Sequence, residues 1–372
     1  MASDRDNAFT FLRLTLASLV VLAHAFTLGG FGRDPLFAWS RGQLTGGNFS
    51  VIGFFVISGF LLTQSLRLHP SLARFCAHRA ARILPGYWMV LLLTALILAP
   101  ALLRSQSPQL SFGELLRLGP YSALEYLANN WTLKAQQFSI ASLFRENPGG
   151  AAVNGSLWTL YHEAMCYLGL LLLAAFRGLK PGLTGALFAA VYCLQVMDFL
   201  DHSAFLQIAP TAAMAGQFFS SALMRPLYLG FLGGMLVQLA GLHRRWEPWW
   251  LGGAAAGLAL SLPLGLSPIV WPLTLPWLLL ALAHRLPWQA VERFGDWSYG
   301  IYICAFPIQQ GLALAGVPRA GLAVFCAASL VLSFLAGALS WHLVESPILR
   351  AVRGWTKPRE EDAPALREAL PA

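Results

Sequence analysis

Long apolar runs dominate this sequence. They include residues 14–28, 89–103, 168–176 and 251–283, and most of them exceed the length of a buried strand in a water-soluble domain. Only 11% of the 372 residues are charged, against roughly a quarter in an ordinary soluble domain. Because a membrane-spanning helix uses about 20 residues, we expect one all-α integral membrane domain, residues 1–350, built as a bundle of about ten transmembrane helices.

The apolar segments predict where these spans lie, to within a few residues. The ten segments are 9–29, 49–66, 83–103, 156–176, 182–199, 222–241, 247–265, 268–284, 297–315 and 320–342. Residues 203–221 are apolar enough to dip into the membrane surface or to cross the membrane, which leaves eleven spans as the alternative. With ten spans, both termini lie on the same side.

The lysine and arginine residues indicate which side that is. If the termini are cytoplasmic, sixteen of the 25 basic residues lie on the cytoplasmic side and eight lie on the outer side, with Arg13 inside the first span. Membrane proteins carry their excess of basic residues on the cytoplasmic side, so we expect cytoplasmic termini. The net charge of +8 is then explained by topology and not by binding to nucleic acid.

Two polar stretches lie outside the predicted spans. Residues 104–155 form a long loop on the outer side, whose role is either substrate capture or a simple cap on the bundle. Residues 351–372 are charged and contain prolines, which predicts a disordered cytoplasmic tail. The five cysteines have no metal-ligand spacing, so we expect free thiols and no metal site.

The first predicted span contains two ionisable residues. Arg13 and His24 are eleven residues apart, which turns a helix by about 20° beyond three full turns and raises it by about 16.5 Å, so both side chains project from one face. Arg13 is close enough to the cytoplasmic surface for its side chain to reach water, which is the alternative to a functional role. His24 lies deeper, where its imidazole either packs or acts as a general base.

Glu163 lies in the fourth predicted span. If this helix enters from the outer side near Ser156, Glu163 lies about 10 Å below the outer boundary, and His24 lies at about the same depth. A carboxylate at that depth could orient the imidazole and stabilise its charged form, so we expect Glu163 to support His24. The alternative is a helix-end glutamate that faces water.

Small residues and an arginine pair indicate a path for a ligand. Ser58 and Gly59 interrupt the apolar second span, where small side chains allow either close helix packing or room for a long, thin ligand. Arg79 and Arg82 lie three residues apart before the third span and share a helix face. They are either anchors at the membrane surface or ligands for phosphate, to which the planar guanidinium group is suited.

Together these motifs resemble the acyltransferase 3 family of integral membrane O-acyltransferases over roughly residues 9–350. The family's spaced arginine and histidine in the first helix match Arg13 and His24, its second-helix motif matches residues 53–62, and its arginine pair matches Arg79 and Arg82. Two later motifs match residues 155–163 and residues 298–302 with 345–347. Cys304 stands where many members carry a histidine, which leaves His24 as the expected base.

The resemblance implies a mechanism and a set of residues for it. An acyl-coenzyme A, most simply acetyl-coenzyme A, would donate its acyl group to a hydroxyl of a glycan or glycolipid, without a metal ion. The catalytic residues would be His24 as general base, with Glu163 and Arg13. The donor-binding residues would be Arg79, Arg82, Ser58, Gly59 and Tyr302.

The resemblance also implies a multi-pass protein of the bacterial inner membrane that contacts lipid and a glycan or glycolipid acceptor and is compatible with a homo-oligomer. Two other hypotheses stay open from the residues alone. One is a proton-coupled transporter or flippase in which Arg13, His24 and Glu163 form a proton relay. The other is a structural membrane subunit whose polar residues only pack. An enzyme releases a free thiol from the donor, whereas a transporter couples flux to protons and leaves the thioester intact.

Overall fold

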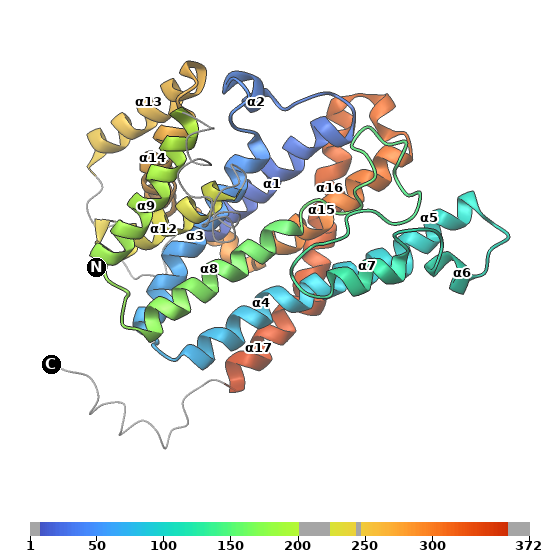
Figure 1. Ribbon diagram of the computed structural model, residues 1–372, viewed down its shortest axis with the longest axis horizontal. Coiled ribbons are helices and arrows are strands. Elements are labelled where there is room, and N and C mark those ends of the chain that lie inside the picture. The colour runs from blue at the N-terminus through green and yellow to red at the C-terminus, as the bar shows by residue number, and fades with distance from the viewer. Residues whose placement is uncertain (1–7, 201–223, 243–246, 356–372) are drawn as a thin grey trace.

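The computed structural model describes residues 8–200, 224–242 and 247–355. The regular secondary structure in these residues is helical, without strands (Figure 1). The long helices are α1 (Phe9–Leu28), α3 (Gly46–Leu68), α4 (Leu72–Leu93), α8 (Trp158–Ala175), α9 (Pro181–Leu200), α12 (Arg225–Leu239), α13 (Pro248–Leu264), α14 (Ser267–Arg285), α15 (Ser298–Leu314) and α16 (Leu322–Ser340). Shorter helices are α2 (Pro35–Trp39), α5 (Ala99–Gln106), α6 (Phe112–Leu116), α7 (Ala123–Asn130), α17 (Ser346–Trp355), η4 (Gln289–Phe294) and η5 (Val317–Ala320).

Each segment that the sequence predicts as a span coincides with one of these helices. Among the described residues, six helices are long and apolar enough to cross a bilayer, namely Phe9–Leu28, Gly46–Leu68, Leu72–Gln106, Pro181–Leu200, Ser267–Arg285 and Leu322–Trp355. Helices α12, α13 and α15 have 15, 17 and 17 residues, and α8 carries a histidine and a glutamate. The all-helical, multi-pass membrane fold is therefore confirmed, whereas the count of ten spans is not. Residues 203–221, on which the alternative of eleven rests, lie outside the described residues.

Helix α3 packs between two groups of helices. On one side it contacts α1, which itself packs against α15 and α16. On the other side it contacts α12, which packs against α9 and α14. The contact with α12 depends on glycine, because an added Cβ at Gly59 would lie 2.0 Å from the carbonyl oxygen of Phe231. Gly59 is therefore a packing position against α12, and it is not among the residues that line the two cavities described below.

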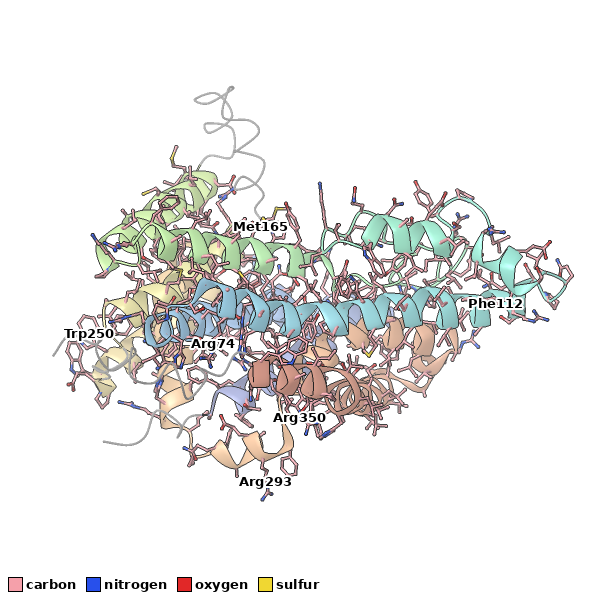
Figure 2. All side chains as sticks on the ribbon, turned by 90° about the horizontal axis from the view of Figure 1, so that it is seen from below. Arg74, Phe112, Met165, Trp250, Arg293 and Arg350 are labelled. Atoms are coloured by element: carbon pink, nitrogen blue, oxygen red, sulfur yellow. The ribbon has the colours of Figure 1, made fainter. Side chains whose placement is uncertain are left out.

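Two long helices each contain a π-helical turn. Residues Leu72–Gln106 run continuously through η1 (Thr94–Leu98), and residues Leu322–Trp355 run through η6 (Trp341–Glu345). Figure 2 shows the first of them extending from near Arg74 toward Phe112, over much of the length of the molecule. The second contains residues 351–355, which the sequence assigned to a disordered tail, and the rest of that tail lies outside the described residues.

The predicted outer loop at residues 104–155 is a folded layer. Its helices α6 and α7 each begin with a capping box, formed by Ser111 with Glu114 and by Ser122 with Glu125. Its buried apolar side chains belong to one core cluster with residues of α4 and α15 and include Leu115, Tyr126, Ile140, Leu143, Phe144 and Val153. The layer is thereby fixed against the helices that carry the polar residues described next.

Candidate active site

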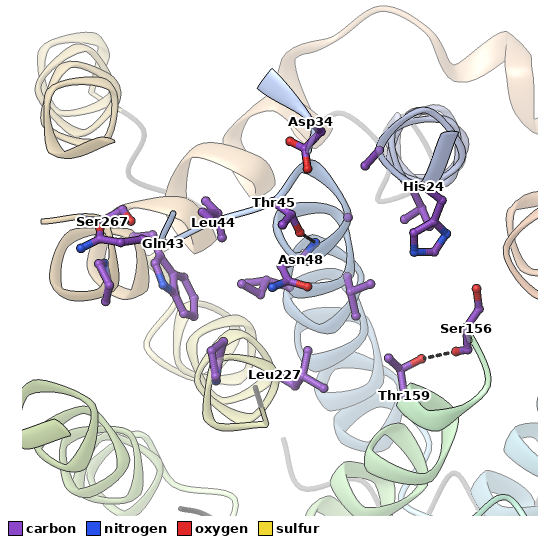
Figure 3. A pocket seen from close by; sticks show the side chains of 18 of the residues that line it. His24, Asp34, Gln43, Leu44, Thr45, Asn48, Ser156, Thr159, Leu227 and Ser267 are labelled. Atoms are coloured by element: carbon purple, nitrogen blue, oxygen red, sulfur yellow. Dashed lines mark hydrogen bonds between the residues drawn. The ribbon is translucent and has the colours of Figure 1, made fainter. Parts of the chain in front are cut away.

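Two adjoining cavities are lined by most of the site residues that the sequence predicted. The arginine pocket has a volume of about 300 Å³, and its lining includes Arg13, Ser58, Arg79, Arg82, Glu163, Tyr167 and Asp296. The histidine pocket has a volume of about 450 Å³, and its lining includes His24, Asp34, Gln43, Asn48 and Ser156 (Figure 3). Val51, Thr159 and Tyr302 line both, so the two cavities meet at these residues.

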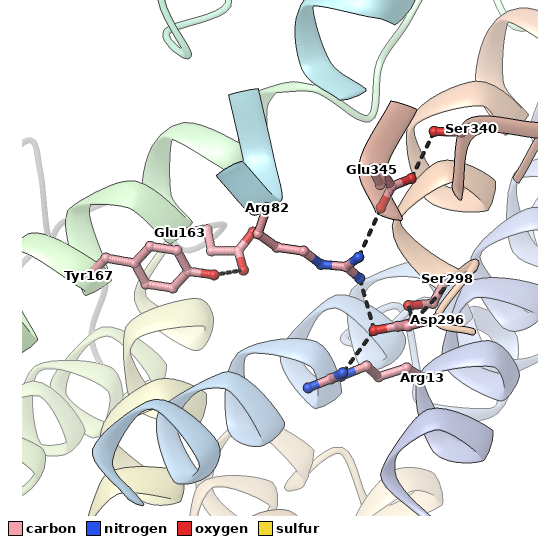
Figure 4. A network of polar contacts seen from close by, with 8 residues as sticks. All are labelled: Arg13, Arg82, Glu163, Tyr167, Asp296, Ser298, Ser340 and Glu345. Carbon is pink, nitrogen blue, oxygen red and sulfur yellow. Dashed lines mark hydrogen bonds and ion pairs between the residues drawn. The ribbon is translucent and has the colours of Figure 1, made fainter. Parts of the chain in front are cut away.

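Arg82 of α4 lies at the centre of a polar network in the arginine pocket (Figure 4). Its guanidinium donates to Glu345 and to Asp296, each at 2.8 Å. The same group lies over the rings of Tyr299 and Trp341, 5.5 and 5.6 Å from their centroids. Arg82 is therefore paired with two carboxylates and packed against two aromatic rings of the protein itself.

Asp296 joins the two arginines of this network. Arg13 of α1 donates to Asp296 at 2.8 Å, to the same carboxylate oxygen as Arg82. The other carboxylate oxygen accepts from the backbone N–H of Ser298, the first residue of α15, at 3.3 Å. Burial alone would raise the pKa of the Asp296 carboxyl, but the Arg82 and Arg13 guanidinium groups outweigh burial and lower this pKa to about 2.

Glu345 completes the network from the π-helical turn η6. Its side chain is fully buried, with 0% exposure, and accepts from Ser340 at 2.7 Å as well as from Arg82. A π-helical turn inserts one residue into a helix and changes the direction of the side chains that follow. The turn thus sets the face from which Glu345 meets Arg82, and the network ties together α1, α4, the start of α15 and the end of α16.

Arg79 differs from Arg82 although the two share a helix. Arg79 lines the arginine pocket and lies 6.0 Å from the ring centroid of Phe75, and it has no ion pair within the described part of the chain. Arg353 of α17 lines the same pocket. The pocket therefore offers guanidinium groups beyond those that Asp296 and Glu345 neutralise.

Glu163 lies in the arginine pocket and not in the histidine pocket. On α8, Tyr167 lies one turn further along and donates a hydrogen bond to Glu163. His162, the residue before Glu163, faces α12 instead and is hydrogen-bonded to Tyr228 at 2.8 Å. The sequence predicted Glu163 beside His24 on the basis of depth alone, whereas the structure places the two side chains in different cavities.

A pair of hydroxyl groups forms the boundary between the two pockets. Thr159 and Tyr302 are hydrogen-bonded to each other at 2.7 Å, and Tyr302 also donates to the backbone oxygen of Ser156 at 3.1 Å. Tyr302 packs edge-on against Phe54, with ring centroids 6.1 Å apart. The wall that the two pockets share therefore contains one tyrosine and one threonine whose hydroxyl groups are held by hydrogen bonds.

His24 faces the histidine pocket from α1. Its ring packs edge-on against Phe306 of α15, with centroids 5.4 Å apart, and Gly47 at the start of α3 lies beside Nε2. Its Nδ1 is buried without a hydrogen-bond partner among the described residues, and so is Ser156 Oγ in the same pocket. Buried polar atoms normally have partners, so these two atoms are candidates for contact with a substrate or with bound water.

The structure thus gathers most of the predicted site residues. Six of them line the arginine pocket, namely Arg13, Ser58, Arg79, Arg82, Glu163 and Tyr302, and Tyr302 lines the histidine pocket as well, together with His24. The sequence analysis missed Asp296 as the partner of both arginines and treated Glu345 only as part of a motif at a helix end. The available signal was one carboxylate just before the ninth predicted span, Asp296, and one just after the tenth, Glu345.

The arrangement has the parts that acyl transfer requires. It combines a basic pocket, a passage bordered by hydroxyl groups and an imidazole with a free ring nitrogen. Within the described residues, no group of histidine, cysteine, aspartate and glutamate side chains is arranged to hold a metal ion.

Comparisons with known proteins identify the family of the chain. The model of the acyltransferase 3 family, described as an acyltransferase domain, matches residues 6–339. The chain is 26% identical to an O-acetyl transferase of Shigella phage Sf6 over 369 residues, covering 93% of this chain and 96% of the phage protein. It is 29% identical to nodulation protein 10 of Rhizobium leguminosarum bv. viciae over 369 residues, covering 94% and 95% of the two chains.

No solved structure matches the chain significantly. The family model, however, covers nearly all of the sequence. It includes Arg13 and His24 of α1, Arg79 and Arg82 of α4, and most of the helices that line the two cavities. The chain belongs to the acyltransferase 3 family and is a multi-pass membrane O-acyltransferase.

Proposed function

We propose that the protein transfers an acyl group, most simply acetyl, from acyl-coenzyme A to a hydroxyl of a glycan or glycolipid. The observation that carries this proposal is the junction of two chemically different cavities at Val51, Thr159 and Tyr302. One cavity suits a polyanionic donor and the other suits a hydroxylated acceptor. Among relatives, the O-acetyl transferase of phage Sf6 supports acetyl as the transferred group.

The donor enters through the arginine pocket in this proposal. Coenzyme A carries phosphates that need cationic partners, and Arg79 and Arg353 line this pocket in addition to the arginines paired with carboxylates. The pantetheine arm then passes Ser58 and Tyr302 toward His24. Arg13 and His24 are separated by about 16.5 Å along α1, a length that an extended arm spans.

The chemistry takes place in the histidine pocket. His24 accepts the proton of the acceptor hydroxyl while the hydroxyl oxygen forms a bond to the thioester carbonyl carbon. The carbon–sulfur bond then breaks, and the proton passes from the imidazole to the departing thiolate, which leaves as free coenzyme A. General-base catalysis of this kind typically contributes about 10² to 10⁴ in rate.

Glu163 contributes from the donor side. Thr159 and Glu163 lie four residues apart on α8 and therefore on one helix face, which runs from the boundary of the two pockets into the arginine pocket. Glu163 and Tyr167 thereby shape the wall along which the donor passes. This role replaces direct support of His24.

We propose a bacterial inner membrane as the location, with both termini and the arginine pocket on the cytoplasmic side, where acyl-coenzyme A is made. The excess of basic residues in the segments assigned to that side supports this orientation. The histidine pocket then receives its acceptor from the outer side.

The test is release of free thiol from acetyl-coenzyme A by the purified protein in membranes, with and without a crude glycan extract from the host. Release that requires both His24 and the extract supports acyl transfer. Equal release by His24→Ala contradicts the assignment of the base. Absence of release together with absence of coenzyme A binding contradicts the donor, and proton-coupled flux then becomes the function to measure.

A further inference from the structure

A third cavity adjoins the histidine pocket. It has a volume of about 500 Å³ and lies among α1, α2, α3, α13 and α14. Asp34 is the one charged residue among the described residues that line it, and the other side chains are aliphatic, aromatic or absent. Ala23, Asp34 and Leu44 line both this cavity, here called the apolar groove, and the histidine pocket.

One face of α13 forms a wall of the apolar groove. Ala255, Leu258, Ala259 and Leu262 follow the spacing of a single helix face, and all four line the groove. Helix α13 lies at the edge of the bundle, at the upper left of Figure 1, and its main helix contact is with α14. Its alanines therefore leave unfilled space toward α1 and α2.

Asp34 marks the boundary between the groove and the histidine pocket. Its Oδ1 accepts from the backbone N–H groups of Leu36, Phe37 and Gly46 at 3.1, 3.3 and 3.0 Å. Since all three bonds use one oxygen, Oδ2 has no hydrogen-bond partner within the part of the chain that the structure describes. Asp34 as a whole is only 6% exposed, but it lines both cavities, so a hydroxyl donor in either cavity can approach its free oxygen.

These contacts place three environments in sequence. The histidine pocket contains the free Nδ1 of His24, Asp34 presents a free oxygen at the shared wall, and the apolar groove continues beyond it. A molecule that matches these three environments in their spatial order has a reactive hydroxyl, further hydroxyls next to it and a hydrocarbon chain. Neither a free glycan nor a simple alkane fits all three.

We propose that the apolar groove binds the hydrocarbon chain of an amphiphilic acceptor whose sugar head group lies in the histidine pocket. This inference rests on the proposed acyl transfer and narrows its acceptor to a sugar linked to an alkyl or isoprenoid chain. The head group donates a hydroxyl hydrogen bond to Asp34, and the chain packs on Leu36, Leu258 and Leu262.

The acyl chain of the donor fits the groove less well. A chain that starts from a thioester near His24 would have to pass Asp34, and its methylene groups would cover the free carboxylate oxygen without offering a hydrogen bond. An amphiphilic acceptor reverses this order, because its polar atoms meet Asp34 and its methylene groups meet leucine side chains. The acceptor is therefore the favoured occupant.

The experiment is photolabelling of the full chain in phosphatidylcholine nanodiscs with a dodecyl glucoside that carries a diazirine in its chain. We expect label on residues 255–262, saturating with probe and displaced by excess dodecyl glucoside but not by glucose. Ala255→Trp, which fills the groove, should lower this label at least tenfold. Ala256→Trp, at an exposed position of α13 outside the groove lining, should leave it unchanged.

Three outcomes would overturn the proposal. Label that does not saturate, or that is equally strong on exposed residues of α16 such as Leu335, would show that bulk lipid fills the groove. Displacement by dodecanoyl-coenzyme A at lower concentration than by dodecyl glucoside would assign the groove to the donor. Equal loss of label in Ala255→Trp, Ala259→Trp and Ala256→Trp would show that labelling does not depend on the residues that line the groove.

The result is separable from the proposed function. His24→Ala, which should release no thiol from acetyl-coenzyme A, should still take up the label in the groove. Saturable labelling in a protein without any thiol release would contradict acyl transfer and leave the groove assignment standing, whereas normal thiol release without labelling would do the reverse.

Discussion

The arginine pocket and the histidine pocket adjoin, yet their polar groups are satisfied in opposite ways. In the arginine pocket, Arg82 is held by two carboxylates and two aromatic rings. In the histidine pocket, His24 Nδ1 and Ser156 Oγ are buried without partners among the described residues. The centre of the first pocket is paired within the protein, with Arg79 and Arg353 at its wall outside those ion pairs, whereas the second pocket has buried polar atoms without partners among the described residues.

This difference separates stability from activity. The ion pairs of Arg82 and Arg13 connect four elements that are distant in sequence, so a change there should first weaken the fold. A change at His24 removes no hydrogen bond within the described residues and should leave the fold intact while chemistry is lost. Substitutions at His24, Arg82 and Arg79 test whether the two pockets separate in this way, and one at Gly59 tests the packing of α3 on α12.

The largest effect is expected from His24→Ala. Loss of a general base should lower kcat by about 10² to 10⁴, because the acceptor hydroxyl then has no group to take its proton. The thermal midpoint in detergent should stay within a few degrees of the wild type. Acyl transfer to a host glycan extract measures the change in kcat. Near-normal turnover in this variant would contradict the assignment of His24 as the base.

Arg82→Ala should mainly reduce stability. Removal of this guanidinium leaves Glu345 buried without a cation, and breaking a buried pair in this way costs about 3–5 kcal/mol. Thermal unfolding in detergent measures the loss. The second substitution in Arg82→Ala/Glu345→Gln removes the stranded charge, so the double variant should recover part of the stability. An Arg82→Ala protein as stable as the wild type would mean that the network does not hold the helices together.

Gly59→Ala should also act on stability and not on donor binding. The added methyl group would lie 2.0 Å from the backbone oxygen of Phe231, so α3 and α12 must separate, and overpacking of this kind typically costs about 1–3 kcal/mol. Ser58→Ala, at the neighbouring position, is the matched control for stability. Ser58 lines the arginine pocket, so loss of its hydroxyl group should not force α3 and α12 apart. A raised KM for acetyl-coenzyme A in Gly59→Ala at unchanged thermal midpoint would restore Gly59 to the donor path.

The sequence alone predicted the helices better than it predicted the contacts between them. Apolar runs place every predicted span on a helix, because a run of about 20 apolar residues has few other structures available in a bilayer. Arg13 and His24 were visible because ionisable residues inside such a run are costly. The capping boxes of α6 and α7 were also in the sequence, as the S-x-x-E patterns at Ser111 and Ser122, and would have predicted two helix starts within residues 104–155.

Partners at long range were not predictable from pattern. Arg82 meets Asp296 and Glu345 across 214 and 263 residues of sequence, and no periodicity carries that information. The depth argument for Glu163 failed for another reason. Helices α1 and α8 each line both cavities, but Glu163 shares the arginine pocket with Arg13, which lies three turns along α1 from His24. The depth calculated from the expected end of the helix therefore did not give the level at which Glu163 lies.

The smallest effect, and the sharpest comparison, is expected from Arg79→Ala beside Arg82→Ala. Arg79 forms no ion pair in the described residues, and Arg82 and Arg13 remain near Glu163 when it is removed, so the thermal midpoint should change much less than in Arg82→Ala. If its guanidinium binds a donor phosphate, KM for acetyl-coenzyme A should rise about tenfold, which corresponds to about 1.4 kcal/mol, while kcat changes little. Arg117→Ala, at an exposed position that lines neither pocket, controls for loss of positive charge. An unchanged KM would make Arg79 an anchor at the membrane surface, and the division of labour between the two arginines would then be lost, because neither would be left to bind the donor.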